Sequence, residues 1–203
     1  MINTNSWNKI RYTLYQPLYN AVAGIFANYR QKSIESLALN PDDRILIVGA
    51  GTGLDLDYLQ GYTNITAIDI TPAMLAQLRR RAKKLDIEVD TRIMDGSKLE
   101  FEDDRFDAVI LHLIVAVIPD PVGCLRETER VLKTGGKITI MDKFVPSGQQ
   151  PGVLRRVLSF FSNIIATHLN RDIDALLNQT NFTKTNHQKL GSIFWLINAQ
   201  KVG

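Results

Sequence analysis

Three glycines at alternate positions, Gly49, Gly51 and Gly53, follow the apolar run "RILIV" (44–48). A strand, a tight turn and a helix start in this order commonly hold the phosphate or sugar of a nucleotide, since glycine lets backbone approach the ligand closely. The spacing is Gly-x-Gly-x-Gly, and Leu54 stands where a dinucleotide fingerprint has its third glycine. The turn predicts a nucleotide site and leaves a redox enzyme, a methyl-transfer enzyme and a simple binder all open.

Two carboxylates narrow the choice of nucleotide. Asp69 ends a second apolar stretch 20 residues after Gly49, where a carboxylate can accept hydrogen bonds from both ribose hydroxyls. Asp95, in "IMDGSKL" (93–99), could accept from an adenine amino group, or could merely cap a helix. No second glycine-rich turn or basic cluster follows to hold a pyrophosphate. The sequence therefore predicts S-adenosylmethionine as the cofactor, with S-adenosylhomocysteine as its product.

These residues need a scaffold of alternating strands and helices. The pattern predicts strands at 44–48, 64–69, 87–93, 106–114 and 135–144, with helices at 71–85 and 120–133. Thr71 and Pro72 suit the N-cap and first position of the first of these helices. Such alternation predicts a doubly wound α/β fold, with a mostly parallel sheet and helices on both faces.

The pattern changes after residue 145. Residues 151–169 carry an apolar stripe at helical spacing, and residues 182–190 and 193–202 alternate as a terminal antiparallel strand pair. We expect a single domain over 1–203. It consists of an N-terminal helical cap (1–40), a cofactor-binding core (41–145), an inserted helical segment (146–180) and the strand pair (181–203).

Composition restricts the class of protein. A chain of 203 residues with 45% hydrophobic content can bury one good core. The single cysteine, Cys124, excludes a disulfide framework, and the three scattered histidines suggest no metal site. The longest apolar run, 108–118, is shorter than the roughly 20 residues that span a bilayer, and no signal peptide is evident. We expect a cytoplasmic protein.

The charges are distributed unevenly. Residues 35–142 hold 19 of the 21 acids and 13 of the 24 bases, whereas 1–34 and 143–171 hold bases and no acid. Basic flanks suggest an anionic partner such as a membrane surface, or else an ordinary solvated surface. Neither flank shows the aromatic-interleaved strands expected for nucleic-acid binding, so no nucleic-acid partner is expected. The oligomeric state stays open.

Four stretches, "ILIVGAGTG", "AIDITPAML", "RIMDGSKLEFEDDRFDAVI" and "ETERVLKTGGKITIMD", resemble the successive motifs of class I S-adenosylmethionine-dependent methyltransferases. The resemblance covers about 42–143 and implies seven strands, the last of them antiparallel. It also implies a set of residues around the cofactor. These are Gly49, Ala50, Gly51 and Gly53 at the methionine and ribose, Asp69 at the ribose, Ile70 and Met74 beside the adenine, Asp95 and Gly96 at the adenine edge, and Leu111 and His112 near the methyl donor.

A narrower resemblance concerns the acceptor. "YTLYQPLYNAV", "LHLIVAVIPDPVGCLRE" and "MDKF" look like bacterial phospholipid N-methyltransferases, which methylate the amine of phosphatidylethanolamine and associate peripherally with membranes. The same stretches also resemble quinone-biosynthesis methyltransferases. A quinone or soluble acceptor, or a non-catalytic S-adenosylmethionine-binding module at the membrane, are therefore the alternatives.

Candidate acceptor-site residues follow from this chemistry. His112 could take the proton of an amine, or could be a buried core histidine. Tyr12, Tyr15 and Tyr19 could present aromatic faces to a methylammonium, with Tyr19 closest to the reaction, or could only pack the cap onto the core. Basic residues of the flanks are candidates for a phosphate headgroup, namely Lys143, Arg155, Arg156 and Arg171.

Overall fold

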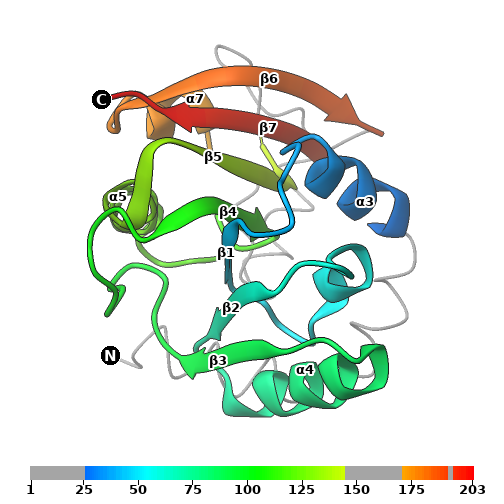
Figure 1. Cartoon of the computed structure of the whole chain (residues 1–203). Coiled ribbons are helices and arrows are strands. Elements are labelled where there is room, and N and C mark those ends of the chain that lie inside the picture. The colour runs from blue at the N-terminus through cyan, green and yellow to red at the C-terminus, as the bar shows by residue number, and fades with distance from the viewer. Residues whose placement is uncertain (1–25, 145–170, 192–193) are drawn as a thin grey trace, which may run out of the picture.

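A seven-stranded sheet forms the centre of the protein, in the order β3-β2-β1-β4-β5-β7-β6 (Figure 1). The computed structural model describes residues 26–144, 171–191 and 194–203. The strands are β1 (Arg44–Val48), β2 (Asn64–Asp69), β3 (Val89–Ile93), β4 (Phe106–His112), β5 (Leu132–Lys143), β6 (Phe182–Leu190) and β7 (Phe194–Lys201). Strands β1 to β5 pair in parallel, whereas β7 pairs antiparallel with both β5 and β6.

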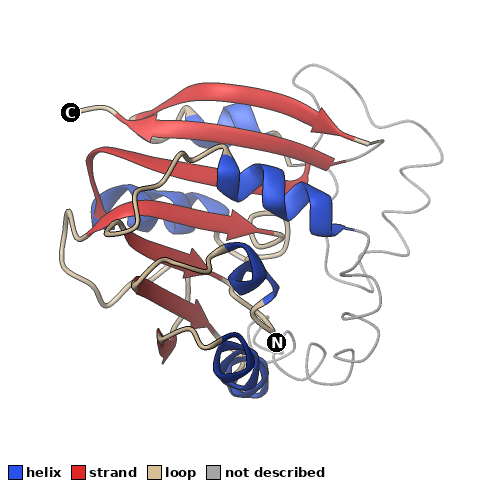
Figure 2. Cartoon of the chain, turned by 45° about the vertical axis from the view of Figure 1, so that its right-hand side comes forward, coloured by secondary structure: helices blue, strands red, loops and turns tan. Residues whose placement is uncertain are grey.

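Helices cover both faces of the sheet (Figure 2). They are α3 (Ala27–Glu35), the 3-10 helix η2 (Leu54–Tyr58), α4 (Pro72–Leu85), α5 (Pro121–Val131) and α7 (Ile173–Leu177). Because strand side chains alternate, Ile45 and Ile47 of β1 pack with α3, η2 and α4, whereas Leu46 and Val48 pack with α5 and α7. The two faces of β1 thus enter two different hydrophobic cores, which explains why residues 45–48 are all apolar.

Local sequence signals set the ends of the helices. Pro72 and Pro121 occupy the first turn of α4 and α5, where the missing N–H costs nothing. The Asp120 carboxylate caps α5 by accepting from the Gly123 N–H at 2.8 Å. Helix α4 ends at Leu85, because the next residue, Asp86, has a left-handed φ of 55° that stops the helix.

The predicted doubly wound α/β fold is confirmed, and each strand overlaps its predicted range. Three differences stand out. The glycine-rich turn leads into the short 3-10 helix η2 instead of a full α-helix, β4 ends at His112 and not at 114, and β5 begins at Leu132 where the helix was expected to continue. At Leu132 the backbone is already extended, with φ −85° and ψ 136°.

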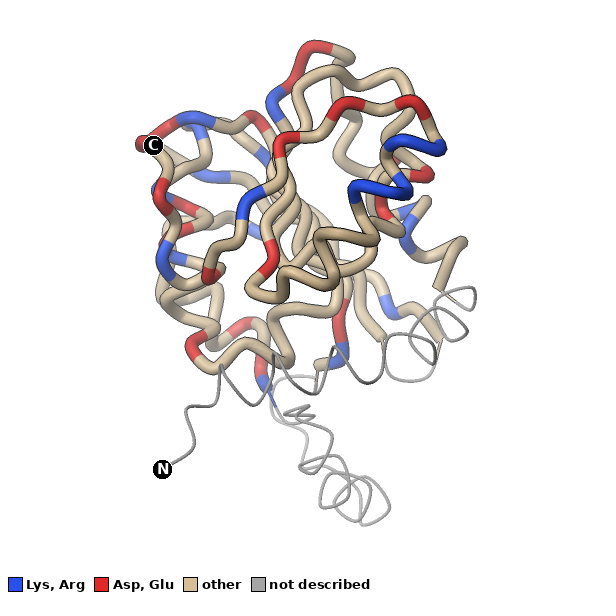
Figure 3. The backbone as a smooth tube through the Cα atoms, turned by 90° about the horizontal axis from the view of Figure 1, so that it is seen from below, with Lys and Arg blue, Asp and Glu red and all other residues tan. Residues whose placement is uncertain are grey.

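Among the described strands, β3 and β6 form the two edges of the sheet. In β6 the side chains of residues 183–189 are all exposed, so only its ends, Phe182 and Leu190, enter a core. Figure 3 shows acidic and basic residues interspersed over the described part of the chain.

The predicted amphipathic helix at 151–169 and most of the N-terminal cap lie outside the described residues, and the predicted domain boundaries stay predictions. None of the helices in the described ranges has the length and apolarity to cross a bilayer.

Candidate functional site

The glycine-rich turn lies at the carboxyl end of β1, between β2 and the loop that follows β4. Gly49 and Gly53 have φ values of 67° and 80°, which side chains other than glycine rarely adopt. A Cβ atom on Gly49 would lie 2.8 Å from the Ile114 side chain, and one on Gly53 would lie 2.8 Å from Leu78. Glycine is therefore needed at both positions for the turn to pack between its neighbours.

Asp69 fixes this turn to the end of β2. One carboxylate oxygen accepts from the Gly51 N–H at 2.9 Å and the other from the Thr71 N–H at 2.8 Å. Burial raises the pKa of Asp69, and these two backbone hydrogen bonds oppose the rise. Because each carboxylate oxygen can accept more than one hydrogen bond, Asp69 can still receive ribose hydroxyls.

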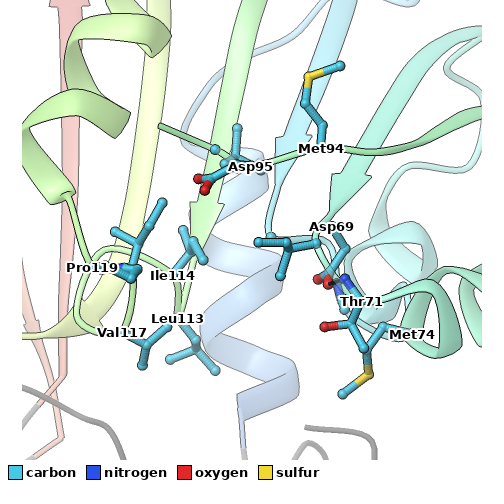
Figure 4. Close-up of a pocket in the computed structure, with 15 residues that line it drawn as sticks. Asp69, Thr71, Met74, Met94, Asp95, Leu113, Ile114, Val117 and Pro119 are labelled. Carbon is cyan, nitrogen blue, oxygen red and sulfur yellow. Dashed lines mark hydrogen bonds between the residues drawn. The ribbon is translucent and has the colours of Figure 1, made fainter. Parts of the chain in front are cut away.

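Asp95 lies at the end of β3, on the same edge of the sheet. Its Oδ1 accepts from the Ser97 N–H at 2.9 Å and from the Ser97 hydroxyl at 2.8 Å, which closes a local turn; no helix begins here, so Asp95 is not the helix cap of the alternative interpretation. It also lines the pocket, where Figure 4 shows it across from Asp69. A turn contact and a ligand contact are thus compatible at this residue.

The opposite wall of the pocket is the loop after β4, which we call the 113–119 loop. Its residues Leu113, Ile114 and Val117 face Asp69, Thr71 and Met74 across the pocket (Figure 4). The loop turns sharply, because Leu113 has a left-handed φ of 60° and its N–H is held by the Met141 carbonyl at 2.8 Å. This wall is apolar and suits a thioether or an aromatic ring.

Two charged side chains hold the backbone of the 113–119 loop. Asp142 accepts from the Ala116 N–H at 2.8 Å, and Arg171 donates to the carbonyls of Val115 and Ile118. Burial raises the pKa of Asp142 to about 6, and burial lowers the pKa of Arg171.

The structure brings most of the predicted cofactor residues together. The pocket is lined by Gly49, Gly51, Asp69, Ile70, Met74, Asp95 and Gly96. Ala50 and Gly53 belong to the same turn but do not line the pocket, and Leu111 is fully buried in the core beside α5.

Sequence reasoning missed Thr71, Met94 and the 113–119 loop, all of which line the pocket. The available signal was positional. These residues directly follow β2, β3 and β4, and the carboxyl ends of parallel strands meet at one edge of the sheet, where ligands bind.

The described residues among the predicted acceptor-site residues do not line the pocket. His112 is 3% exposed and does not line the pocket, and both of its ring nitrogens contact protein side chains. Lys143 is half-buried with its Nζ 5.6 Å from the centre of the Phe194 ring, and Arg171 binds the 113–119 loop. Tyr12, Tyr15, Tyr19, Arg155 and Arg156 lie outside the described residues, so their roles stay predictions.

The pocket fits the chemistry of S-adenosylmethionine. Asp69 and Asp95 can accept hydrogen bonds from ribose hydroxyls and an adenine amino group, and the described residues of the lining include no basic side chain of the kind that would hold a pyrophosphate. The glycine turn allows close approach and the 113–119 loop supplies an apolar wall. Among the described residues no group of three potential ligands could hold a metal ion.

Comparison with known proteins finds similarity to methyltransferases. Residues 46–140 match a family described as "Methyltransferase domain". The chain is 32% identical over 127 residues to phosphatidylethanolamine N-methyltransferase of Cereibacter sphaeroides, covering 62% of this chain and 63% of that protein. It is 31% identical over 117 residues to demethylmenaquinone methyltransferase of Tropheryma whipplei, covering 57% and 48%. The chain thus spans between about half and just under two thirds of these relatives.

Solved structures share the fold at low sequence identity. The [4+2]-cyclase SpnF superposes with a TM-score of 0.82 at 18% identity, covering 99% of this chain and 98% of that one. Geranyl diphosphate C-methyltransferase from Streptomyces coelicolor, solved with S-adenosyl-L-homocysteine, has a TM-score of 0.75 at 15% identity, covering 86% and 78%. A cyclase and a methyltransferase on one scaffold show that the fold alone does not define the reaction.

Proposed function

We propose that the chain is a class I S-adenosylmethionine-dependent methyltransferase and that it transfers a methyl group to an amphiphilic acceptor, the amine of phosphatidylethanolamine or its methylated derivatives. The assignment of the cofactor rests on one observation: Asp69 and Asp95 line the same pocket, at one edge of the sheet beside the glycine-rich turn. The similarity to a phosphatidylethanolamine N-methyltransferase supports the acceptor part.

Each part of the pocket has a task in this reaction. The bound cofactor supplies an electrophilic methyl group on a sulfonium. Asp69 accepts the ribose hydroxyls and, through Gly51 and Thr71, keeps the turn in place. Asp95 accepts from the adenine edge, and the 113–119 loop excludes water from the apolar side. Positioning of this kind is the main contribution that a protein makes to an in-line displacement.

A quinone is the second candidate for the acceptor, because of the names of several relatives. Several of the curated relatives are named demethylmenaquinone or ubiquinone/menaquinone biosynthesis methyltransferases, at 25–31% identity. A quinone ring is also an amphiphilic acceptor, and the apolar 113–119 wall would suit it as well as a lipid.

A methyl-transfer assay distinguishes the two. Purified protein is incubated with methyl-labelled S-adenosylmethionine and a total bacterial lipid extract, and the products are separated by chromatography. Label in the methylated ethanolamine phospholipids supports the proposed acceptor, whereas label in the quinone fraction supports the second candidate. The Asp69→Ala variant serves as the cofactor-dependent control. No label in any lipid fraction would contradict an amphiphilic acceptor.

A further inference from the structure

A buried polar cluster lies between α3 and the sheet, outside the cofactor pocket. Arg30 and Ser33 come from α3, Asp55 from η2 and His112 from the end of β4, and all four residues are less than 5% exposed. The Arg30 Nη1 atom lies 2.5 Å from one Asp55 carboxylate oxygen, and His112 Nδ1 lies 2.7 Å from the same oxygen. Such a cluster needs every proton to be accounted for, because an unsatisfied polar group is costly here.

Asp55 is ionised. Burial alone would raise the pKa of its carboxyl group, but the Arg30 guanidinium and the His112 ring hold the pKa well below its usual range. An ionised carboxylate only accepts hydrogen bonds. The proton in the contact between Asp55 and His112 therefore resides on Nδ1.

The protons on the other side of the ring follow from the far end of the network. The Ser36 hydroxyl donates to the Ser33 carbonyl at 2.6 Å, so the Ser36 oxygen accepts from Asn198 Nδ2 at 2.8 Å. This orientation leaves Asn198 Oδ1 as the acceptor for the Thr139 hydroxyl at 3.1 Å. Since Thr139 has only one proton, the Ser33 hydroxyl must donate in its 2.7 Å contact with Thr139.

Ser33 can then only accept from His112, whose Nε2 lies 2.7 Å from the Ser33 oxygen. Both ring nitrogens of His112 consequently carry a proton, because the 2.7 Å contacts with Asp55 and Ser33 are both hydrogen bonds only if the ring is an imidazolium. Arg30 Nη1, 3.4 Å from Nδ1, is then a neighbouring donor whose partner is Asp55. Asp55, His112 and Ser33 have the order of a nucleophilic triad, but Ser33 donates away from the histidine and is fully buried, so it is not an activated nucleophile.

We propose that His112 is a positioning residue, held as an imidazolium, that fastens α3 to the cofactor-binding turn through Ser33 and Asp55. Asp55 is two residues after Gly53, and the Leu56 N–H bonds to the Gly53 carbonyl at 3.1 Å. A shift of Asp55 therefore shifts the turn that approaches the cofactor. In this state His112 has no lone pair with which to accept a proton from a substrate amine.

Several charged or titratable groups surround His112. Arg30 of α3 and Asp55 of η2 contact it directly, and Tyr58, Asp57 and Arg81 lie beyond them on η2 and α4. Ser33 and Thr139, on its other side, do not titrate in the usual range.

Nitrogen NMR of histidine-labelled protein tests the protonation state directly. The chain has three histidines, so loss of a signal in His168→Gln and in His187→Gln identifies two of them and assigns the third to His112. At neutral pH we expect both ring nitrogens of His112 to show the protonated signature. A neutral ring, with one unprotonated nitrogen, would overturn the proposal.

Binding and kinetics test the positioning role, which rests on the proposed methyltransferase function. For His112→Gln we expect the Kd for S-adenosylhomocysteine to rise about tenfold, the loss of one hydrogen bond to a charged group. At saturating cofactor, kcat should change little. Ser33→Ala should also raise the Kd and leave kcat nearly unchanged, whereas the control His187→Gln should change neither. A kcat lower by roughly 10²–10⁴ with unchanged Kd would instead make His112 the proton acceptor. Absence of methyl transfer by the unaltered protein would refute the proposed function alone, because the NMR and binding results do not depend on it.

Discussion

Asp142 and Arg171 bind the same loop through opposite backbone groups, although they are far apart in the sequence. Asp142 accepts from the Ala116 N–H, while Arg171 donates to the carbonyl groups of Val115 and Ile118. Together they fix a loop whose first residue, Leu113, has a strained left-handed backbone. The apolar wall of the pocket thus depends on two charged residues that do not line it.

Replacing Arg171 should weaken that wall. Arg171→Met keeps most of the side-chain volume but loses two hydrogen bonds from a charged donor, each worth about 1.5–3 kcal/mol where water does not compete. We expect a lower free energy of unfolding, by about 2 kcal/mol, and weaker S-adenosylhomocysteine binding by calorimetry. Lys184→Met, which removes an exposed pair with Asp174, is the control and should cost at most about 1 kcal/mol. Equal losses in both variants would show that Arg171 has no special role.

Asp142 should make stability depend on pH. Its pKa in the folded protein, about 6, exceeds the usual value of 3.8, so the folded state binds the proton more tightly than the unfolded state. The stabilisation from this proton is complete below about pH 4 and is lost as the pH rises to about 6, a change of at most about 3 kcal/mol.

Denaturant unfolding at several pH values between 4 and 6.5 measures this effect. Asp142→Asn removes the titrating group, so its free energy of unfolding should fall less steeply than that of the unaltered protein over the same range. Parallel pH profiles would mean that the Asp142 pKa is not raised.

Gly49→Ala tests the packing of the turn against the 113–119 loop. The new Cβ would face both a left-handed φ and a 2.8 Å contact with Ile114. We expect a loss of about 3 kcal/mol in unfolding free energy, from strain and overpacking together. Gly61→Ala has a φ of 93° but open space around the Cβ, so it should lose only the strain part. If the two variants are equally stable, contact with Ile114 is not limiting.

Asp69→Ala should weaken cofactor binding. The variant loses the ribose acceptor and the two backbone contacts that hold Gly51 and Thr71. Hydrogen bonds to a charged acceptor are worth roughly 1.5–3 kcal/mol each, so calorimetry should show at least a tenfold higher Kd for S-adenosylhomocysteine. Asp90→Ala removes an exposed carboxylate from the neighbouring strand and should leave the Kd unchanged. Unaltered affinity in Asp69→Ala would place the ribose elsewhere.

The basic flanks lead to a membrane prediction. We expect the protein to sediment with vesicles that contain anionic lipid, and to be released as salt is raised, because each basic residue near such a surface contributes about 1 kcal/mol. Arg155→Glu with Arg156→Glu should abolish sedimentation. Lys83→Glu with Lys84→Glu changes the net charge equally on the exposed end of α4 and is the control. Equal sedimentation with neutral and anionic vesicles would argue against an electrostatic membrane partner.

The parts of the site that follow a strand locally were predictable from the sequence. Gly49 directly follows β1, Asp69 is the last residue of β2 and Asp95 lies two residues after β3, so strand and turn signals locate all three without any tertiary information. The 113–119 loop was not recognised, because an apolar pocket wall and a buried strand have the same composition, and only the backbone turn at Leu113 separates them.

Contacts between distant elements could not be predicted. His112 stood out as a histidine within an apolar run, but its partners Asp55 and Ser33 belong to η2 and α3, and no spacing in the sequence relates the three. The same holds for Arg171, which was expected to meet a phosphate and instead binds carbonyl groups of the 113–119 loop. Such roles depend on how helices pack on the sheet.

The open edge of the sheet at β6 bears on the solubility of the protein. An unpaired strand edge offers hydrogen-bonding groups to any other extended chain, and a run of apolar side chains there would favour aggregation. In β6 the exposed residues 183–189 are polar, and they include Lys189 and Lys184, of which Lys184 pairs with Asp174. An edge without apolar side chains gains little from contact with a second copy, so this composition disfavours the growth of an intermolecular sheet.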